Sequence, residues 1–74
     1  MNAVSAFWRL RRVREEVSLS KSTIYRLVNE GAFPRPIKVG EAATAWLEHE
    51  VRQWMAGRIQ ASRSEPHTPR AARG

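Results

Sequence analysis

The chain has 74 residues, enough for one small domain with a compact apolar core. It contains no cysteine and only two histidines, His49 and His67, so neither a disulfide framework nor a zinc site is predicted. Thirteen basic residues against seven acidic ones give a formal net charge of +6 and a pI near 11.4, which favours a polyanionic partner such as DNA, RNA or an acidic membrane surface.

The positive charge is concentrated in the first half of the chain and near its end. Residues 1–40 carry eight basic and three acidic side chains, residues 41–59 carry two and three, and residues 60–74 carry three and one. A surface that contacts a polyanion is therefore expected in the first half. No apolar run approaches the roughly 20 residues of a membrane span, and the start lacks the basic segment of a signal peptide. The expected location is cytoplasmic, in association with the nucleoid.

The first predicted helix is short. Residues 1–6 are expected to be a flexible start, and residues 7–10 a strand-like segment. Residues 11–17 predict a helix, because Val13 and Val17 lie four apart on one face. Three arginines lie mostly off that face, in a charge run typical of a solvated helix surface: Arg11, Arg12 and Arg14.

The most informative segment is the next helix. Ser20 is a good N-cap, because its hydroxyl can accept a hydrogen bond from the backbone two or three residues on. Gly31 suits the position just after a helix, because glycine adopts the left-handed conformation without a side-chain penalty. No glycine or proline lies between them, so the sequence predicts a helix over residues 21–30.

This helix has two distinct faces at about 100° per residue. Its apolar face is expected to lie in the core and holds Ile24, Leu27 and Val28. Its polar face holds Ser22, Arg26 and Asn29. Tyr25 and Glu30 flank this face, and Lys21 lies at its N-terminal edge. Such side chains reach base edges and phosphates when a helix enters the major groove of DNA.

A small hairpin is predicted after this helix. Two prolines keep residues 33–36 extended. Residues 37–39 alternate as a strand, with Lys38 outward and its neighbours Ile37 and Val39 inward. After a turn, residues 43–46 return as the second strand, and Trp46 is expected to anchor this hairpin, or wing.

Residues 48–59 predict a closing helix. Apolar residues at helical spacing are expected to complete the core: Val51, Trp54, Met55 and Ile59. Residues 60–74 are rich in serine, proline and arginine, a composition that predicts a disordered basic tail.

The predicted fold class is mainly α with a small β-hairpin, in a domain over residues 7–59. In that range the chain resembles the AlpA family of phage-type regulators, within the MerR-like and excisionase-like winged helix-turn-helix group. The resemblance rests on Trp46 and on four segments whose order and spacing match: Leu-Ser at 19–20, Thr-Ile-Tyr-Arg at 23–26, Phe-Pro-x-Pro at 33–36 and Glu-Val-x-x-Trp at 50–54.

The resemblance implies sequence-specific binding of double-stranded DNA by helix 21–30. The outcome would be transcriptional regulation or support of integrase-mediated excision, as an excisionase does. An integrase and further copies of the chain on repeated DNA sites are additional candidate partners. Positions that match those expected at DNA are Lys21, Ser22, Thr23, Tyr25, Arg26 and Lys38, and the candidate DNA-binding set is completed by Asn29 and Arg35.

The chain departs from the family pattern in the wing and in the first turn. Ala42 and Leu47 stand where arginine is common, so the wing is less basic than usual, and Ser18 replaces a common glycine. Two interpretations stay open for the arginines of the first helix: they compensate for the missing wing cations, or they are solvated.

An enzyme is not expected, because the chain has no aspartate, no cysteine and no glycine-rich phosphate loop. No catalytic residue, cofactor or metal is predicted. The main alternative to DNA binding is a protein–protein module that recruits an integrase or another partner, with the charge serving solubility. RNA binding is more distant, because the aromatic residues that would stack on bases are assigned to the core.

Overall fold

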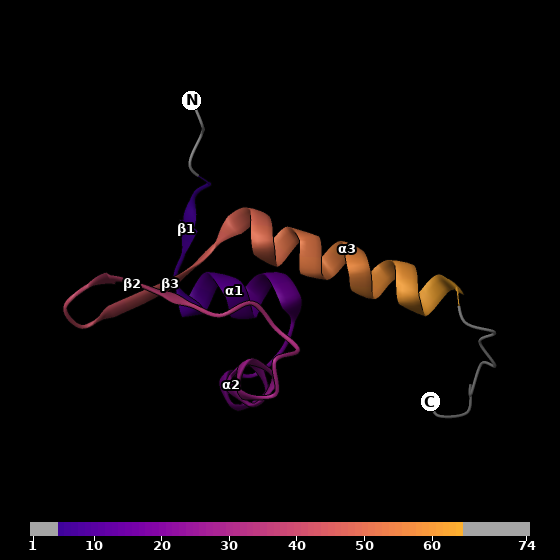
Figure 1. Ribbon diagram of the computed structural model, residues 1–74, viewed down its shortest axis with the longest axis horizontal. Helices are drawn as coiled ribbons and strands as arrows, with labels where there is room; N and C mark the ends of the chain where they lie inside the picture. The colour runs from indigo at the N-terminus through magenta and orange to yellow at the C-terminus, as the bar shows by residue number, and fades with distance from the viewer. Residues whose placement is uncertain (1–4, 65–74) are drawn as a thin grey trace.

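The computed structural model describes residues 5–64, which form three helices and one small antiparallel sheet (Figure 1). In chain order the elements are β1 (Phe7–Trp8), α1 (Leu10–Val17), α2 (Lys21–Asn29), β2 (Ile37–Gly40), β3 (Ala43–Leu47) and α3 (Glu48–Ser64). The predicted class, mainly α with a small hairpin, is confirmed, and the arrangement is compatible with a winged helix-turn-helix domain. None of these helices is long and apolar enough to cross a membrane.

The turn between α1 and α2 is defined by two serines. Ser18 ends α1 in the left-handed conformation, at φ 60°, and its backbone N–H donates to the Arg14 carbonyl at 2.9 Å. Ser20 begins α2 as predicted, because its hydroxyl accepts from the Thr23 N–H at 3.2 Å. Gly31 follows the helix at φ 77°, so both predicted helix limits are confirmed to within one residue.

β3 is the central strand of the sheet, between β1 and β2. Trp8 lies opposite Trp46 in the β1–β3 pair. Because residues directly opposite each other in an antiparallel pair point to the same face, both indole rings lie on the core side. Trp46 is fully buried, and its Nε1 donates to the Pro34 carbonyl at 2.9 Å. Its predicted role as the anchor of the wing is confirmed.

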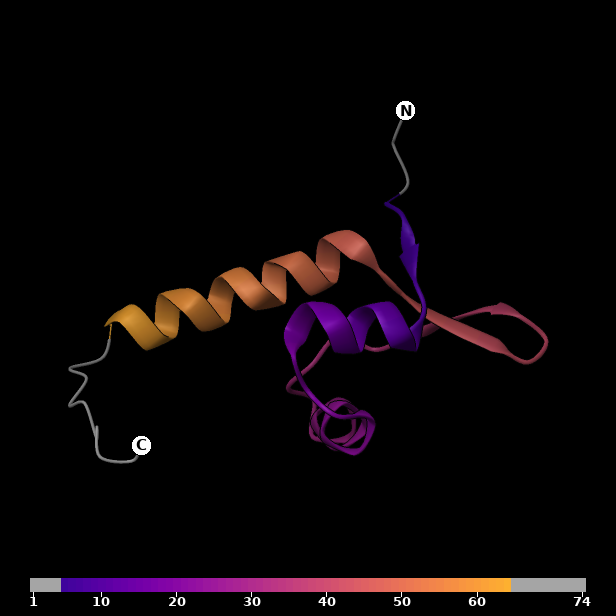
Figure 2. The same ribbon diagram turned by 180° about the vertical axis from the view of Figure 1, so that it is seen from behind.

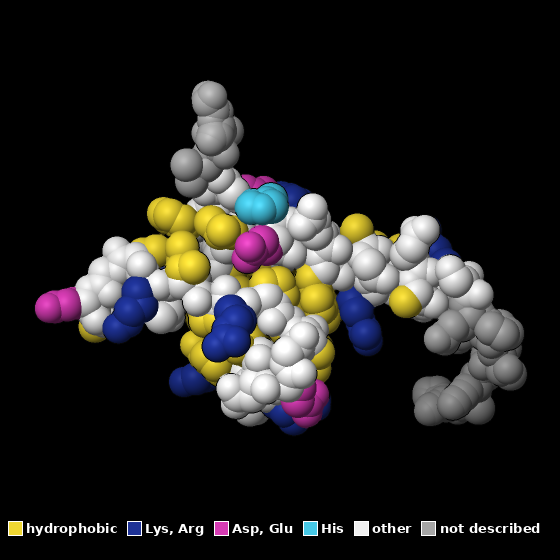
Figure 3. All heavy atoms as spheres, in the orientation of Figure 1, with side chains coloured by type: hydrophobic (Ala, Val, Ile, Leu, Met, Phe, Trp, Pro, Cys, Tyr) yellow, Lys and Arg dark blue, Asp and Glu magenta, His cyan; other side chains and the backbone are white. Residues whose placement is uncertain are grey.

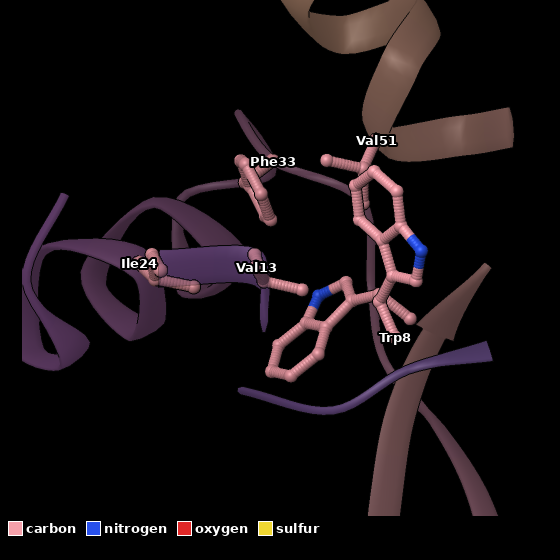
Figure 4. Close-up of a cluster of buried hydrophobic side chains, with 6 residues drawn as sticks. Trp8, Val13, Ile24, Phe33 and Val51 are labelled. Atoms are coloured by element: carbon pink, nitrogen blue, oxygen red, sulfur yellow. The ribbon is translucent and has the colours of Figure 1, made fainter. Parts of the chain in front are cut away.

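The core lies where the three helices meet the sheet. It is formed by buried residues from all layers of the fold: Trp8, Val13, Ile24, Phe33, Ala45, Trp46 and Val51. Figure 4 shows side chains of this core converging from the helices, from the β1 strand and from the loop that follows α2, among them Trp8, Val13, Ile24, Phe33 and Val51. Half-buried residues of α2 and α3 pack against this cluster, as predicted: Leu27, Val28, Trp54 and Met55.

The expectation that Ile37 and Val39 face inward is wrong. Their side chains are 38% and 39% exposed, because the hairpin extends sideways past the helices (Figures 1 and 2). The predicted end of the last helix is also wrong. α3 continues to Ser64, through residues 60–64 that the composition assigned to a disordered tail. The expectation that Ile59 completes the core is wrong too, because its side chain is 50% exposed. Residues 65–74 lie outside the described part of the chain.

The segment before β1 is bound to the start of α3, so the prediction of a flexible start does not hold for residues 5 and 6. The His49 N–H donates to the Ser5 hydroxyl at 2.9 Å, and the Glu48 N–H donates to the Ala6 carbonyl at 2.8 Å. The first N–H groups of a helix have no partner within the helix, and here the acceptors come from a distant segment of the chain.

Candidate nucleic-acid interface

α2 lies on the outer side of α1, away from α3, in both ribbon views (Figures 1 and 2). Its inner face is held by Ile24, which is fully buried. Its outer face presents Ser22, Arg26 and Asn29, all exposed. Because these three residues are spaced four and three apart, they form one strip along the helix, which we call the polar strip.

Three further candidates of α2 lie beside the polar strip. Lys21 is exposed in the first turn. Thr23 is half-buried, and its Oγ1 accepts from the Ser20 hydroxyl at 3.0 Å, so this side chain takes part in the N-cap. Tyr25 is half-buried and meets Trp46 edge to face, with the ring centroids 6.0 Å apart. The rings of Tyr25 and Trp46 therefore link α2 to the sheet.

The loop after α2 presents Arg35 from a well-fixed backbone. Phe33, two residues before it, is buried and meets Trp54 edge to face at a centroid distance of 4.7 Å. The Trp54 Nε1 donates to the Ala32 carbonyl at 2.7 Å, and Pro34 accepts from the indole of β3 as described above. The Arg35 side chain itself is exposed.

Lys38 is exposed on β2, opposite Thr44 of β3. Opposite residues share a face, and Thr44 lies two positions from Trp46, so Lys38 points to the sheet face on which Tyr25 packs. The wing thus presents Lys38 on the side of the sheet where α2 lies.

Ion pairs divide the basic residues into two groups. Four arginines are paired with a glutamate one helical turn away, at nitrogen–oxygen distances of 3.9, 2.8, 3.3 and 2.6 Å: Arg11 with Glu15, Arg12 with Glu16, Arg26 with Glu30 and Arg52 with Glu48. Other basic side chains have no acidic partner within residues 5–64, and they include Arg14 and the candidates Lys21, Arg35 and Lys38. Figure 3 shows basic side chains over the wing and around α2.

Arg12 and Arg52 are engaged with the core. Their guanidinium carbons lie 4.6 Å and 5.2 Å from the centroid of the Trp8 ring. A guanidinium over the face of an indole is attracted by the negative charge density of the ring. Of the α1 arginines whose role the sequence left open, Arg12 therefore contributes to the fold, whereas Arg14 has no described acidic partner.

The Arg26–Glu30 pair lies on the surface of α2. The Arg26 Nη1 donates to both carboxylate oxygens of Glu30, at 3.3 and 3.5 Å, and the two side chains are 60% and 53% exposed. From the sequence, Glu30 is expected only as a flank of the polar face, and this pairing is not among the predictions. The available signal was the four-residue spacing, which places the two side chains next to each other on a helix.

Comparison with known proteins agrees with the resemblance. The family model described as "Prophage CP4-57 regulatory protein (AlpA)" matches residues 6–59, from β1 through most of α3. "Uncharacterized protein ORF88" of Enterobacteria phage P4 is 47% identical over 53 residues, which are 72% of this chain and 60% of that relative. The match thus spans less than two thirds of the length of that relative. The chain belongs to the AlpA family of phage regulatory proteins.

Proposed function

We propose that this chain is a sequence-specific double-stranded DNA-binding regulator whose α2 helix enters the major groove. The observation that supports this proposal best is the exposed polar strip of α2, near which lie cations that have no acidic partner within residues 5–64. α2 has nine residues and is therefore about 13 Å long. An α-helix with its side chains is about 10–12 Å in diameter, which matches the roughly 12 Å width of the major groove.

The side chains of the polar strip suit different bases. Arginine donates two hydrogen bonds to guanine, asparagine exchanges two with adenine, and serine can contact either kind of base edge. We expect Lys21, Arg35 and Lys38 to contact phosphates, which would fix the helix in its register on the duplex. Arg26 and Asn29 would then carry most of the base preference.

The regulatory outcome follows from occupancy of a DNA site. One short helix reads few base pairs, so neighbouring copies on repeated sites would raise the affinity of each copy. A bound array could control transcription, or it could direct an integrase to excise an integrated element. Both outcomes are part of the proposal, and both require that the chain distinguish its own site from other DNA.

The first experiment is selection of duplexes from a random pool, followed by affinity measurements on the selected duplex and on a scrambled one across a range of salt concentrations. If about five phosphates are neutralised, the logarithm of affinity should fall with the logarithm of salt at a slope of roughly −4 to −5. A slope near zero contradicts DNA binding. Equal affinity for both duplexes contradicts sequence specificity.

The second experiment assigns the specificity to α2. Arg26→Ala is expected to lose roughly 1–3 kcal/mol at the selected duplex and to relax base preference at one or two positions. Arg11→Ala is the matched control, because Arg11 is also exposed and paired with a glutamate four residues on, but lies on α1. If Arg26→Ala keeps the parental preference, α2 does not read the bases, and specificity comes from α1 or from a partner.

A protein–protein module remains the second candidate, because two apolar side chains are exposed on one face of the sheet. Phe7 lies opposite Leu47 and Ile37 opposite Ala45, which places all four on the face away from Trp46. Phe7 and Ile37 are exposed there. Binding to an integrase without preference for the selected duplex would favour this alternative.

A further inference from the structure

We propose that Glu30 is a specificity-determining residue of α2, because its pairing with Arg26 disfavours DNA that offers phosphates but no matching base edge. This inference rests on the proposed function and deepens it. On the same surface, Glu30 would weaken binding to DNA that lacks the preferred sequence, whereas its neighbours bind the preferred sequence.

The geometry of the pair leaves part of Arg26 available. Glu30 engages Nη1 alone, through both of its carboxylate oxygens. Within residues 5–64, Nε and Nη2 of Arg26 have no hydrogen-bond acceptor. That side of a guanidinium carries two parallel N–H groups, which match O6 and N7 of guanine. Arg26 can therefore contact a guanine while it remains paired with Glu30.

The backbone at Glu30 is fixed at the end of α2. Glu30 is the C-cap residue of this helix, and its N–H donates to the Arg26 carbonyl at 3.0 Å. The carboxylate is one turn beyond the guanidinium on the exposed side of the helix. It is also the acidic group nearest to the polar strip in sequence, since residues 21–29 contain neither aspartate nor glutamate.

The selectivity comes from a difference between two bound states. On a duplex without the matching guanine, the chain would still bind more tightly if the Arg26 side chain turned to a phosphate. To do so it must leave Glu30, and the freed carboxylate then lies close to the negatively charged backbone. On the matching duplex no such loss occurs, because the pair and the base contact coexist. Glu30 thus weakens the unwanted complex more than the wanted one, which increases specificity.

The test is a double-mutant cycle in the full chain, with Arg26→Ala, Glu30→Gln and the two combined, on the selected and scrambled duplexes. Glu30→Gln is expected to tighten binding to scrambled DNA and to steepen its salt slope by about one unit, as Arg26 gains a phosphate. The ratio of selected to scrambled affinity should fall by about two- to fivefold, because the interaction lost is that of one exposed ion pair. In the Arg26→Ala background, Glu30→Gln should leave that ratio unchanged.

Glu15→Gln is the matched control, because it removes the same charge from an exposed pair on α1. It should tighten both duplexes equally and leave the ratio unchanged. All variants should keep near-parental melting temperatures, since an exposed pair at this spacing contributes little to stability. A purely structural role for Glu30 would instead appear as a lower melting temperature.

Two results would overturn the inference while leaving the proposed function intact. In one, Glu30→Gln keeps the parental ratio although Arg26→Ala reduces it. In the other, Glu30→Gln reduces the ratio equally with and without Arg26. If the parent itself shows no preference for the selected duplex, the proposed function fails, and this inference fails with it.

Discussion

Replacement of Ser18 by glycine should stabilise the turn between α1 and α2. Ser18 has φ 60° and ψ 38°, and within residues 5–64 it is the one non-glycine residue with a positive φ. The left-handed conformation costs an L-residue roughly 1–2 kcal/mol, because Cβ approaches the following carbonyl oxygen. The side chain is exposed, so its removal gives up no buried contact. Glycine also gives the unfolded chain more conformational freedom, which lowers the stability of the folded state by roughly 0.4–1 kcal/mol and offsets part of this gain.

The net stabilisation expected for Ser18→Gly, taken between the midpoints of these two ranges, is therefore roughly 0.8 kcal/mol, or about 3–6 °C in melting temperature for a domain of this size. Thermal unfolding followed by circular dichroism measures this shift. Ser18→Ala is the control, because it keeps Cβ and the strain, and it should not raise the melting temperature. Gly31→Ala is the converse test and should destabilise, since Gly31 has φ 77°. A melting temperature of Ser18→Gly at or below that of Ser18→Ala would refute the argument from backbone strain.

Three further substitutions test other contacts. Ser5→Ala removes the hydroxyl that accepts from the first turn of α3 and should cost about 1 kcal/mol, seen as a lower melting temperature; an unchanged value would show that this cap contributes nothing. Trp54→Phe keeps an aromatic ring beside Phe33 but loses the donor to the Ala32 carbonyl, so urea unfolding should show a loss of roughly 0.5–1.5 kcal/mol. Lys38→Ala should weaken selected and scrambled duplexes about equally and reduce the salt slope by roughly one unit; a changed ratio would mean that Lys38 contacts bases.

The sequence predicted α2 and its polar strip well because their signals are local. Ser20 and Gly31 mark the two ends of the helix within the helix's own neighbourhood, and the spacing of apolar residues identifies the inner face. The exposure of Ile37 and Val39, in contrast, has no local signal in the sequence. A strand that alternates apolar and polar residues has the same pattern whether or not another element covers its apolar face, so the local pattern cannot reveal that the hairpin extends past the helices.

The remaining errors have two causes: some contacts join residues far apart in the sequence, and the composition of a segment does not show where a helix inside it ends. The two serines and one arginine of residues 60–64 resemble the following segment in composition, yet no proline interrupts α3 there. Ser5 binds the start of α3 across 44 positions of sequence, and no local motif marks that contact. The four-residue spacing of Arg12 and Glu16 indicates their pairing, but the position of Arg12 over Trp8 depends on how β1 meets α1.

The pairing of β1 with β3 has a consequence for folding kinetics. It joins residues 7–8 to residues 46–47, whereas α1, α2 and the hairpin are formed by contacts between near neighbours in sequence. The entropy lost on closing a loop grows with its length, so the β1–β3 contact and the Ser5 cap are expected to form after the local elements. Contacts that form late act mainly on the unfolding rate. Weakening the first segment therefore shortens the lifetime of the folded domain more than it slows its formation.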